Sequence, residues 1–101
     1  MIKPRINIPQ EKLADFCRKQ QIRKLSLFGS VLEGSFGQDS DIDVLVEFEK
    51  GARIGFIRLA AMELELSQIL GRKTDLRTPA ELSRYFREDV LKNAEVQYEK
   101  E

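Results

Sequence analysis

Two aspartates separated by a single residue, Asp41 and Asp43, give the clearest chemical signal in the sequence. They begin the run DIDVLVEF, whose alternation of side chains predicts a strand over residues 41–48. Side chains two apart on a strand leave the same face, with Cα atoms roughly 6.5–7 Å apart, so the two carboxylates can converge. Two such charges about 4 Å apart repel by about 4 kcal/mol at an effective dielectric of about 20, so close pairs bind a cation or share a proton. The pair predicts a divalent metal site, and a solvated strand face is the alternative.

A third aspartate, Asp75, would complete a site for phosphoryl transfer if its strand lies beside residues 41–48. It belongs to the run KTDLR, which predicts a short strand over residues 73–77. Two oxygen-ligated ions roughly 3.5–4 Å apart can hold the attacking and leaving oxygens of an in-line displacement, and a third carboxylate helps to bind them. Simple exposure of Asp75 on its strand is the alternative.

Upstream, the dipeptide Gly29-Ser30 ends a strand predicted over residues 22–28 and begins a helical turn. Free N–H groups and the helix dipole at such a turn favour an anion, and a triphosphate would fit there. Glycine lets the backbone approach phosphate closely, and the Ser30 hydroxyl can donate one further hydrogen bond. Taken alone, the dipeptide is more typical of an ordinary turn than of a phosphate site, and the aspartates that follow it reverse that order.

The remaining sequence predicts helices and strands that alternate in one small domain spanning residues 1–101. Helices are expected over residues 9–20 and 56–70, the second ending at Gly71, and a further helix starts near residue 79 and continues or restarts toward residue 91. The charged tail NAEVQYEKE is expected to fray unless a partner orders it. The predicted fold is α/β (α+β), a small mixed sheet with helices packed mainly on one side.

The long helix carries two apolar arcs. One arc should cover the sheet, and the other would be buried by the terminal helices or would form a partner interface. The first arc contains Leu59, Met62, Leu66, Ile69 and Leu70, and the second contains Phe56, Ile57, Ala60, Ala61 and Leu64. Cys17, at helical spacing from Leu13 and Phe16, is predicted to be a core residue.

Composition excludes several functional classes. With no histidine, the chain cannot build a Ser-His-Asp triad, a Cys-His pair or a histidine-ligated zinc site. Seventeen basic and seventeen acidic residues cancel, so direct nucleic-acid binding is not expected. One cysteine, no apolar run near the roughly 20 residues that span a bilayer, and no signal core predict a soluble cytoplasmic protein without membrane contact.

The run LFGSVLEGSFGQDSDIDVLVEF resembles the signature of the DNA polymerase beta-like nucleotidyltransferase superfamily. Its minimal branch, the MNT-type proteins encoded beside HEPN-domain partners, is the most similar, and the resemblance covers roughly residues 22 to 80. It implies the nucleotidyltransferase fold, with Mg²⁺ bound by the residues matching Asp41, Asp43 and Asp75, and the triphosphate held at Gly29 and Ser30.

The resemblance also implies transfer of a nucleoside monophosphate, often AMP from ATP, to a hydroxyl of a HEPN-type toxin, with the chain acting as antitoxin. Many relatives carry arginine where this chain has Val31 and Glu33, and Arg72 or Lys73 could replace that positive charge. The main alternative is an antitoxin that neutralises its partner by contact without catalysis. A weaker alternative is nucleotidylation of a small molecule or an RNA end. A homo- or hetero-oligomer is compatible with both antitoxin hypotheses.

Overall fold

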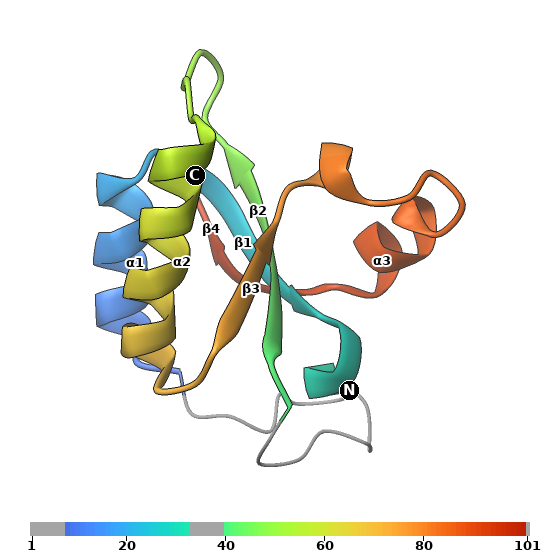
Figure 1. Ribbon diagram of the computed structural model, residues 1–101, viewed down its shortest axis with the longest axis horizontal. Helices are drawn as coiled ribbons and strands as arrows, with labels where there is room; N and C mark the ends of the chain where they lie inside the picture. The colour runs from blue at the N-terminus through green and yellow to red at the C-terminus, as the bar shows by residue number, and fades with distance from the viewer. Residues whose placement is uncertain (1–7, 33–39, 101) are drawn as a thin grey trace.

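Four strands, three α-helices and two short 3-10 turns make up the part of the chain that this computed structural model describes, residues 8–32 and 40–100 (Figure 1). In chain order they are α1 (Gln10–Lys19), β1 (Ile22–Phe28), η1 (Gly29–Leu32), β2 (Ile42–Phe48), α2 (Phe56–Leu70), β3 (Thr74–Arg77), η2 (Pro79–Glu81), α3 (Arg87–Asn93) and β4 (Glu95–Glu99). Within those two stretches, no helix has the length and apolar character that a bilayer crossing requires.

The strands form one mixed sheet in the order β3-β2-β1-β4. Strand β1 is antiparallel to both β2 and β4, whereas β2 is parallel to β3. A parallel pair needs a crossover connection, and here α2 provides it. The predicted mixed sheet is confirmed, and β3 does lie directly beside β2.

Helices α1 and α2 lie side by side on one face of the sheet, while α3 lies on the opposite side (Figure 1). The core forms between these two long helices and the sheet. Its members include Phe16 and Cys17 from α1, Val44 from β2 and Leu66 from α2. The arc of α2 predicted to cover the sheet is therefore confirmed, as is the prediction of Cys17 as a core residue.

The ends of the two long helices follow the expected sequence signals. Pro9 precedes α1 in extended conformation, and its carbonyl accepts the N–H of Leu13. Gly71 ends α2 in the left-handed region, with φ of 72°, and its N–H donates to the carbonyl of Ser67. A left-handed glycine is a common helix terminator because it has no Cβ to collide with the backbone.

One expectation about the surface of the fold was wrong, and one of the two alternatives for the second arc of α2 is excluded. The tail does not fray, because residues 95–99 form β4 and pair with β1 along the edge of the sheet. The terminal helices do not bury the second arc of α2, since Phe56, Ile57 and Leu64 are 89%, 90% and 70% exposed. Of the two alternatives for the helix expected from residue 79, the structure shows a restart, since η2 ends at Glu81 and α3 begins at Arg87.

Candidate active site

Strand register brings two of the three predicted aspartates together. Asp43 of β2 and Asp75 of β3 are direct partners in the parallel pairing, and neighbouring strands lie about 4.7–4.9 Å apart. Their neighbours along each strand, such as Val44 and Leu76, are buried in the core under α1 and α2. Because side chains alternate between faces, both aspartates lie on the opposite face of the sheet.

Asp41 lies just before β2 and two residues from Asp43, so its side chain lies on the same face of the sheet. The Lys73 ammonium lies 3.8 Å from its Oδ2, in a pair whose lysine side chain is largely exposed. The backbone here is fixed more firmly: the Ile42 N–H donates to the Lys73 carbonyl at 2.9 Å. The Arg72 guanidinium also donates to the Ser40 carbonyl at 2.9 Å. The end of α2 and the start of β3 therefore hold the segment that carries Asp41.

Gly29 lies directly against Asp43. Its φ is +76°, in the region that glycine adopts most easily, and a Cβ built on it would lie 2.4 Å from Asp43 Oδ2. The contact arises because Phe28, the last residue of β1, pairs with Asp43. Ser30 follows in η1, whereas Glu33 lies outside the described residues. Thus a side chain at position 29 would displace the Asp43 carboxylate.

Partial burial and the neighbouring charges raise the pKa of Asp43. Partial burial is the main cause, and the negative charges of Asp75 and, to a smaller extent, Asp41 act in the same direction. The positive charge of Arg77 opposes them. A carboxylate in this setting is destabilised in its ionised form, which is the situation that a bound cation would relieve.

The carboxylates suit a cation that keeps part of its coordination for other ligands. Among residues 8–32 and 40–100, no three Asp, Glu, Cys or His side chains are grouped closely enough to enclose a metal ion. Magnesium is usually held by one or two carboxylates together with water and substrate phosphates, rather than by a complete protein cage. Asp43 and Asp75 fit that pattern.

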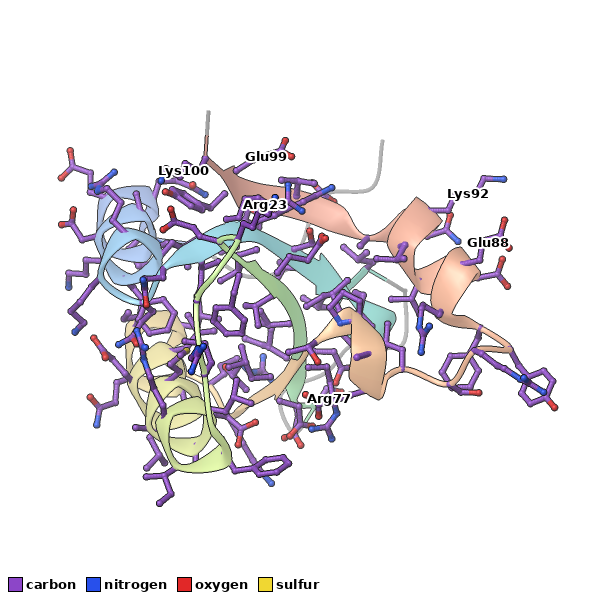
Figure 2. The ribbon with its side chains drawn as sticks, turned by 90° about the horizontal axis from the view of Figure 1, so that it is seen from above. Arg23, Arg77, Glu88, Lys92, Glu99 and Lys100 are labelled. Atoms are coloured by element: carbon purple, nitrogen blue, oxygen red, sulfur yellow. The ribbon has the colours of Figure 1, made fainter. Side chains whose placement is uncertain are left out.

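Arg77 is a candidate that the sequence interpretation missed. It pairs with Leu45 two positions after Asp75, so strand alternation places it on the aspartate face. In Figure 2 it projects at the β3 edge of the sheet, across from Glu99 and Lys100 at the β4 edge. The same two-residue spacing that identified Asp41 and Asp43 could have identified Asp75 and Arg77.

Val31 occupies a position where many relatives were expected to carry arginine, and here it is fully buried in the core. A charged side chain in that orientation would be desolvated. The positive charge on the aspartate face comes instead from the β3 segment, where Arg77 acts on Asp43 and Lys73 lies near Asp41.

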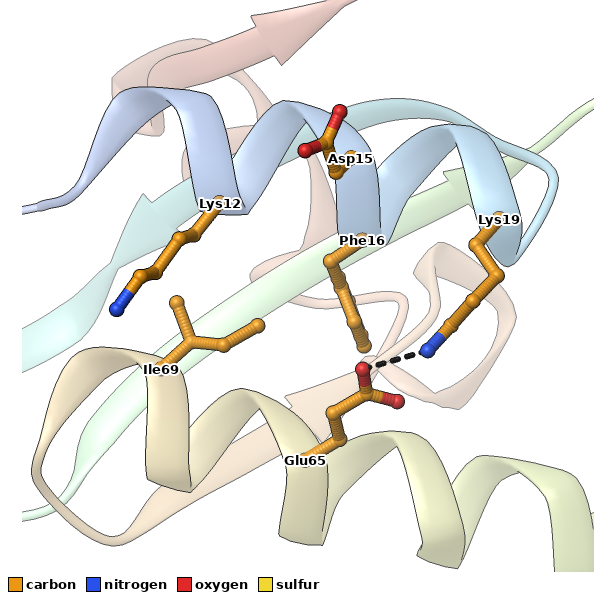
Figure 3. Close-up of a pocket in the computed structure, with 6 residues that line it drawn as sticks. All are labelled: Lys12, Asp15, Phe16, Lys19, Glu65 and Ile69. Atoms are coloured by element: carbon orange, nitrogen blue, oxygen red, sulfur yellow. Dashed lines mark hydrogen bonds and ion pairs between the residues drawn. The ribbon is translucent and has the colours of Figure 1, made fainter.

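A groove between α1 and α2 lies on the helical side of the sheet and contains none of the predicted site residues (Figure 3). Phe16 and Ile69 give it apolar walls, and an ion pair between Lys19 and Glu65, 2.7 Å long, closes one side. This ion pair is partly exposed and contributes little to stability.

Comparison with known proteins links this geometry to one family. A family model described as a nucleotidyltransferase domain matches residues 10–96. A relative from Methanocaldococcus jannaschii, provisionally named a protein adenylyltransferase, is 29% identical over 89 residues, which are 88% of this chain and 94% of the relative.

Solved structures share the fold. A chain in a toxin–antitoxin complex with AMP-PNP superposes with a TM-score of 0.73 at 20% identity, covering 93% of this chain and 76% of that chain. A chain in the complex of a tri-AMPylated Shewanella oneidensis HEPN toxin with MNT antitoxin has a TM-score of 0.65 at 19% identity, covering 90% and 70%. At these identities, the likeness establishes the fold alone.

Proposed function

Because this chain belongs to the nucleotidyltransferase domain family, we propose that it transfers AMP from ATP to a hydroxyl of a HEPN-domain toxin and thereby acts as its antitoxin. The chain is a nucleotidyltransferase by family; the donor, acceptor and biological role are the proposal. The adenylyltransferase name of the archaeal relative and the AMPylated toxin in the Shewanella oneidensis complex support it.

The observation that carries the proposal is the pairing of Asp43 with Asp75 across β2 and β3, with Gly29 against the Asp43 carboxylate. The positive φ of Gly29 alone would favour glycine, but the close approach of the Asp43 carboxylate adds a second reason why no side chain fits there. Two carboxylates in register are a costly arrangement unless a cation or a proton is shared between them. We therefore assign Asp43 and Asp75 as the residues that would hold Mg²⁺ directly. Asp41, on the same face, would be a third ligand once a nucleotide brings the ion into place, since these side chains do not by themselves enclose an ion among the described residues.

In this mechanism, Gly29 and Ser30 hold the triphosphate through the backbone N–H groups of η1. Bound magnesium would neutralise the phosphate charge that builds up during transfer. Asp75 aligns the acceptor hydroxyl and accepts its proton as the hydroxyl oxygen attacks the α-phosphorus. The bond between the α-phosphorus and the oxygen that bridges to the β-phosphate breaks, and pyrophosphate leaves.

Arg77 and Lys73 supply the positive charge that the buried Val31 cannot. Both belong to the β3 segment, and each lies near a different carboxylate of the site. A guanidinium on this face can contact phosphate oxygens with two parallel hydrogen bonds, which an ammonium cannot. We assign to Arg77 a part in holding the charged groups of ATP or of pyrophosphate.

A non-catalytic antitoxin is the second candidate, and Val31 is the observation that favours it. Val31 stands where many relatives were expected to carry arginine, so the site lacks that positive charge. An antitoxin that acts by contact alone would not need Asp43. The two candidates therefore differ in what they predict for Asp43→Ala.

The test is intact-mass spectrometry of a HEPN-domain toxin incubated with this chain, Mg²⁺ and each nucleoside triphosphate in turn. We expect the toxin to gain one or more AMP groups with ATP, and no gain with Asp43→Ala. Glu95→Ala, which removes a carboxylate at the far edge strand, is the matched control and should transfer normally. Neutralisation of the toxin without any mass gain, retained by Asp43→Ala, would establish the contact antitoxin instead.

A further inference from the structure

The outer edge of β3 is held by side chains of α2. Strand β3 ends the sheet, with β2 on its inner side and no strand beyond it among the described residues. The N–H of Leu76 donates to Glu63 Oε2 at 2.8 Å, and the N–H of Thr74 donates to Ser67 Oγ at 3.0 Å. Glu63 and Ser67 are one helical turn apart, so together they take the place of a neighbouring strand.

These two hydrogen bonds flank Asp75. Thr74 precedes it and Leu76 follows it, and the N–H groups of both are bound to α2. The same short strand sets Asp75 opposite Asp43. A shift of β3 along or away from β2 would therefore change the distance between these carboxylates. Misplacement of a catalytic group by about 1 Å can lower a rate by roughly a hundredfold.

We propose that Glu63 and Ser67 are positioning residues for Asp75, and this inference rests on the proposed nucleotidyl transfer. Ser67 has a second hydrogen bond, in which its hydroxyl donates to the Glu63 carbonyl at 2.7 Å. This bond links the two hydrogen bonds from α2 to β3, which we call the tethers, within the helix. The adjacent face of α2 is anchored independently, because Met62 and Leu66 pack in the core. Helix and strand therefore move as one unit, and the tethers transmit the position of α2 to Asp75.

The test compares Glu63→Ala with Glu63→Gln in the full chain. The glutamine side-chain oxygen can still accept from Leu76, whereas alanine leaves that N–H without its partner. With ATP, Mg²⁺ and the toxin, we expect Glu63→Ala to lower kcat by roughly ten- to a hundredfold, with the KM for ATP unchanged. Glu63→Gln should retain kcat within about threefold, and Ser67→Ala should lower it in the same direction as Glu63→Ala.

The matched control is Glu65→Ala. It removes a carboxylate two residues away on α2 that forms an ion pair with Lys19 of α1 and not a hydrogen bond with β3 (Figure 3). It should leave kcat unchanged. All rates are expressed per folded molecule, so a purely structural effect cancels. Wild-type kcat in Glu63→Ala, or equal loss in Glu63→Gln, would overturn the inference.

A second measurement does not depend on catalysis. Amide hydrogen exchange should become faster at Leu76 in Glu63→Ala and stay slow in Glu63→Gln. Unchanged exchange in Glu63→Ala would overturn the inference even if transfer proceeds. A wild-type chain that transfers nothing, with the exchange result as expected, would instead overturn the proposed function.

Discussion

Asp43 is held in the folded chain at an electrostatic cost. Burial and the charges of Asp75 and Asp41 raise its pKa in the folded state. Because the neutral form is not destabilised, the folded state has its full stability in acid, below the unfolded pKa of Asp43. That part of the stability is lost as the pH rises through the folded pKa. Asparagine has nearly the same shape and does not ionise. Asp43→Asn should abolish transfer and also stabilise the free protein at neutral pH.

The stabilising effect of Asp43→Asn will be modest because Asp43 is only partly buried. Screened charge interactions of this kind are worth about 0–1 kcal/mol, and 1 kcal/mol shifts the Tm of a domain this size by roughly 4–8 °C. Thermal melts in EDTA should show a rise of a few degrees at pH 7 that disappears below about pH 4. A lower Tm at pH 7 would contradict the repulsion between these carboxylates.

Gly29 tests whether the close approach to Asp43 matters beyond backbone conformation. Alanine at a left-handed position costs about 1–2 kcal/mol, and here its Cβ would also displace Asp43 Oδ2. Gly51→Ala is the matched control, since Gly51 has φ of +88° but open space around its Cβ position. Both variants should lose similar stability in denaturant melts. Only Gly29→Ala should lose most of its transfer activity, and equal activity in the two would contradict a role for the contact.

At the scale of elements, β4 packs against the core with only one of its two faces. Tyr98 pairs with Leu25 and packs against the core. A register shift between Leu25 and Ser26 pairs Val96 with Ser26 on the other face, where Val96 is 43% exposed. Since its ring is half-buried, Tyr98→Ala should lower the free energy of unfolding by about 1–2 kcal/mol, less than a fully buried aromatic. Val96→Ala should change it by less than about 0.5 kcal/mol. Urea unfolding checks both, and equal losses would show that the strand gains no stability from packing on the core.

Patterned elements could be predicted from sequence, and β4 could not. Strand β1 and helix α2 were predicted with the bounds that the structure has, because each has a clear apolar period and a glycine at its end. The segment EVQYE has two apolar residues among charged ones, and its pairing with β1 joins distant parts of the chain. No local pattern reports such a contact.

The same distinction holds within the site. That Asp41 and Asp43 share a face follows from spacing alone, but the register of Asp43 with Asp75 depends on which strands become neighbours. The tethers from α2 were also beyond sequence reasoning. Glu63 and Ser67 look like ordinary polar residues on the border of an amphipathic helix. Their side chains can accept hydrogen bonds from β3 only because β3 is an edge strand, whose outward N–H groups are not paired with another strand.

In the molecule as a whole, one face of the sheet packs in the core and the other carries the candidate site. One face is covered by α1 and α2 and contains most of the core. The aspartates lie on the other face. In the proposed reaction, ATP and the acceptor would meet them there. A net charge of zero provides no long-range attraction for either. Recognition must therefore come from local charges such as Arg77 and from direct contact.

Ligand binding should therefore stabilise the fold only when nucleotide and Mg²⁺ are bound together, so that the phosphates and the carboxylates share the ion. A non-hydrolysable ATP analogue with Mg²⁺ at about tenfold above its Kd would add about 1.4 kcal/mol of stability, or roughly 6–11 °C in Tm for a domain of this size. Mg²⁺ alone should have little effect, because the carboxylates complete its coordination only with phosphate oxygens. Chelating the metal with EDTA, or replacing Asp43 by Asn, should remove most of the shift. An equal shift with the analogue in EDTA would mean that the nucleotide binds without using the carboxylates, and the metal assignment to Asp41, Asp43 and Asp75 would be wrong.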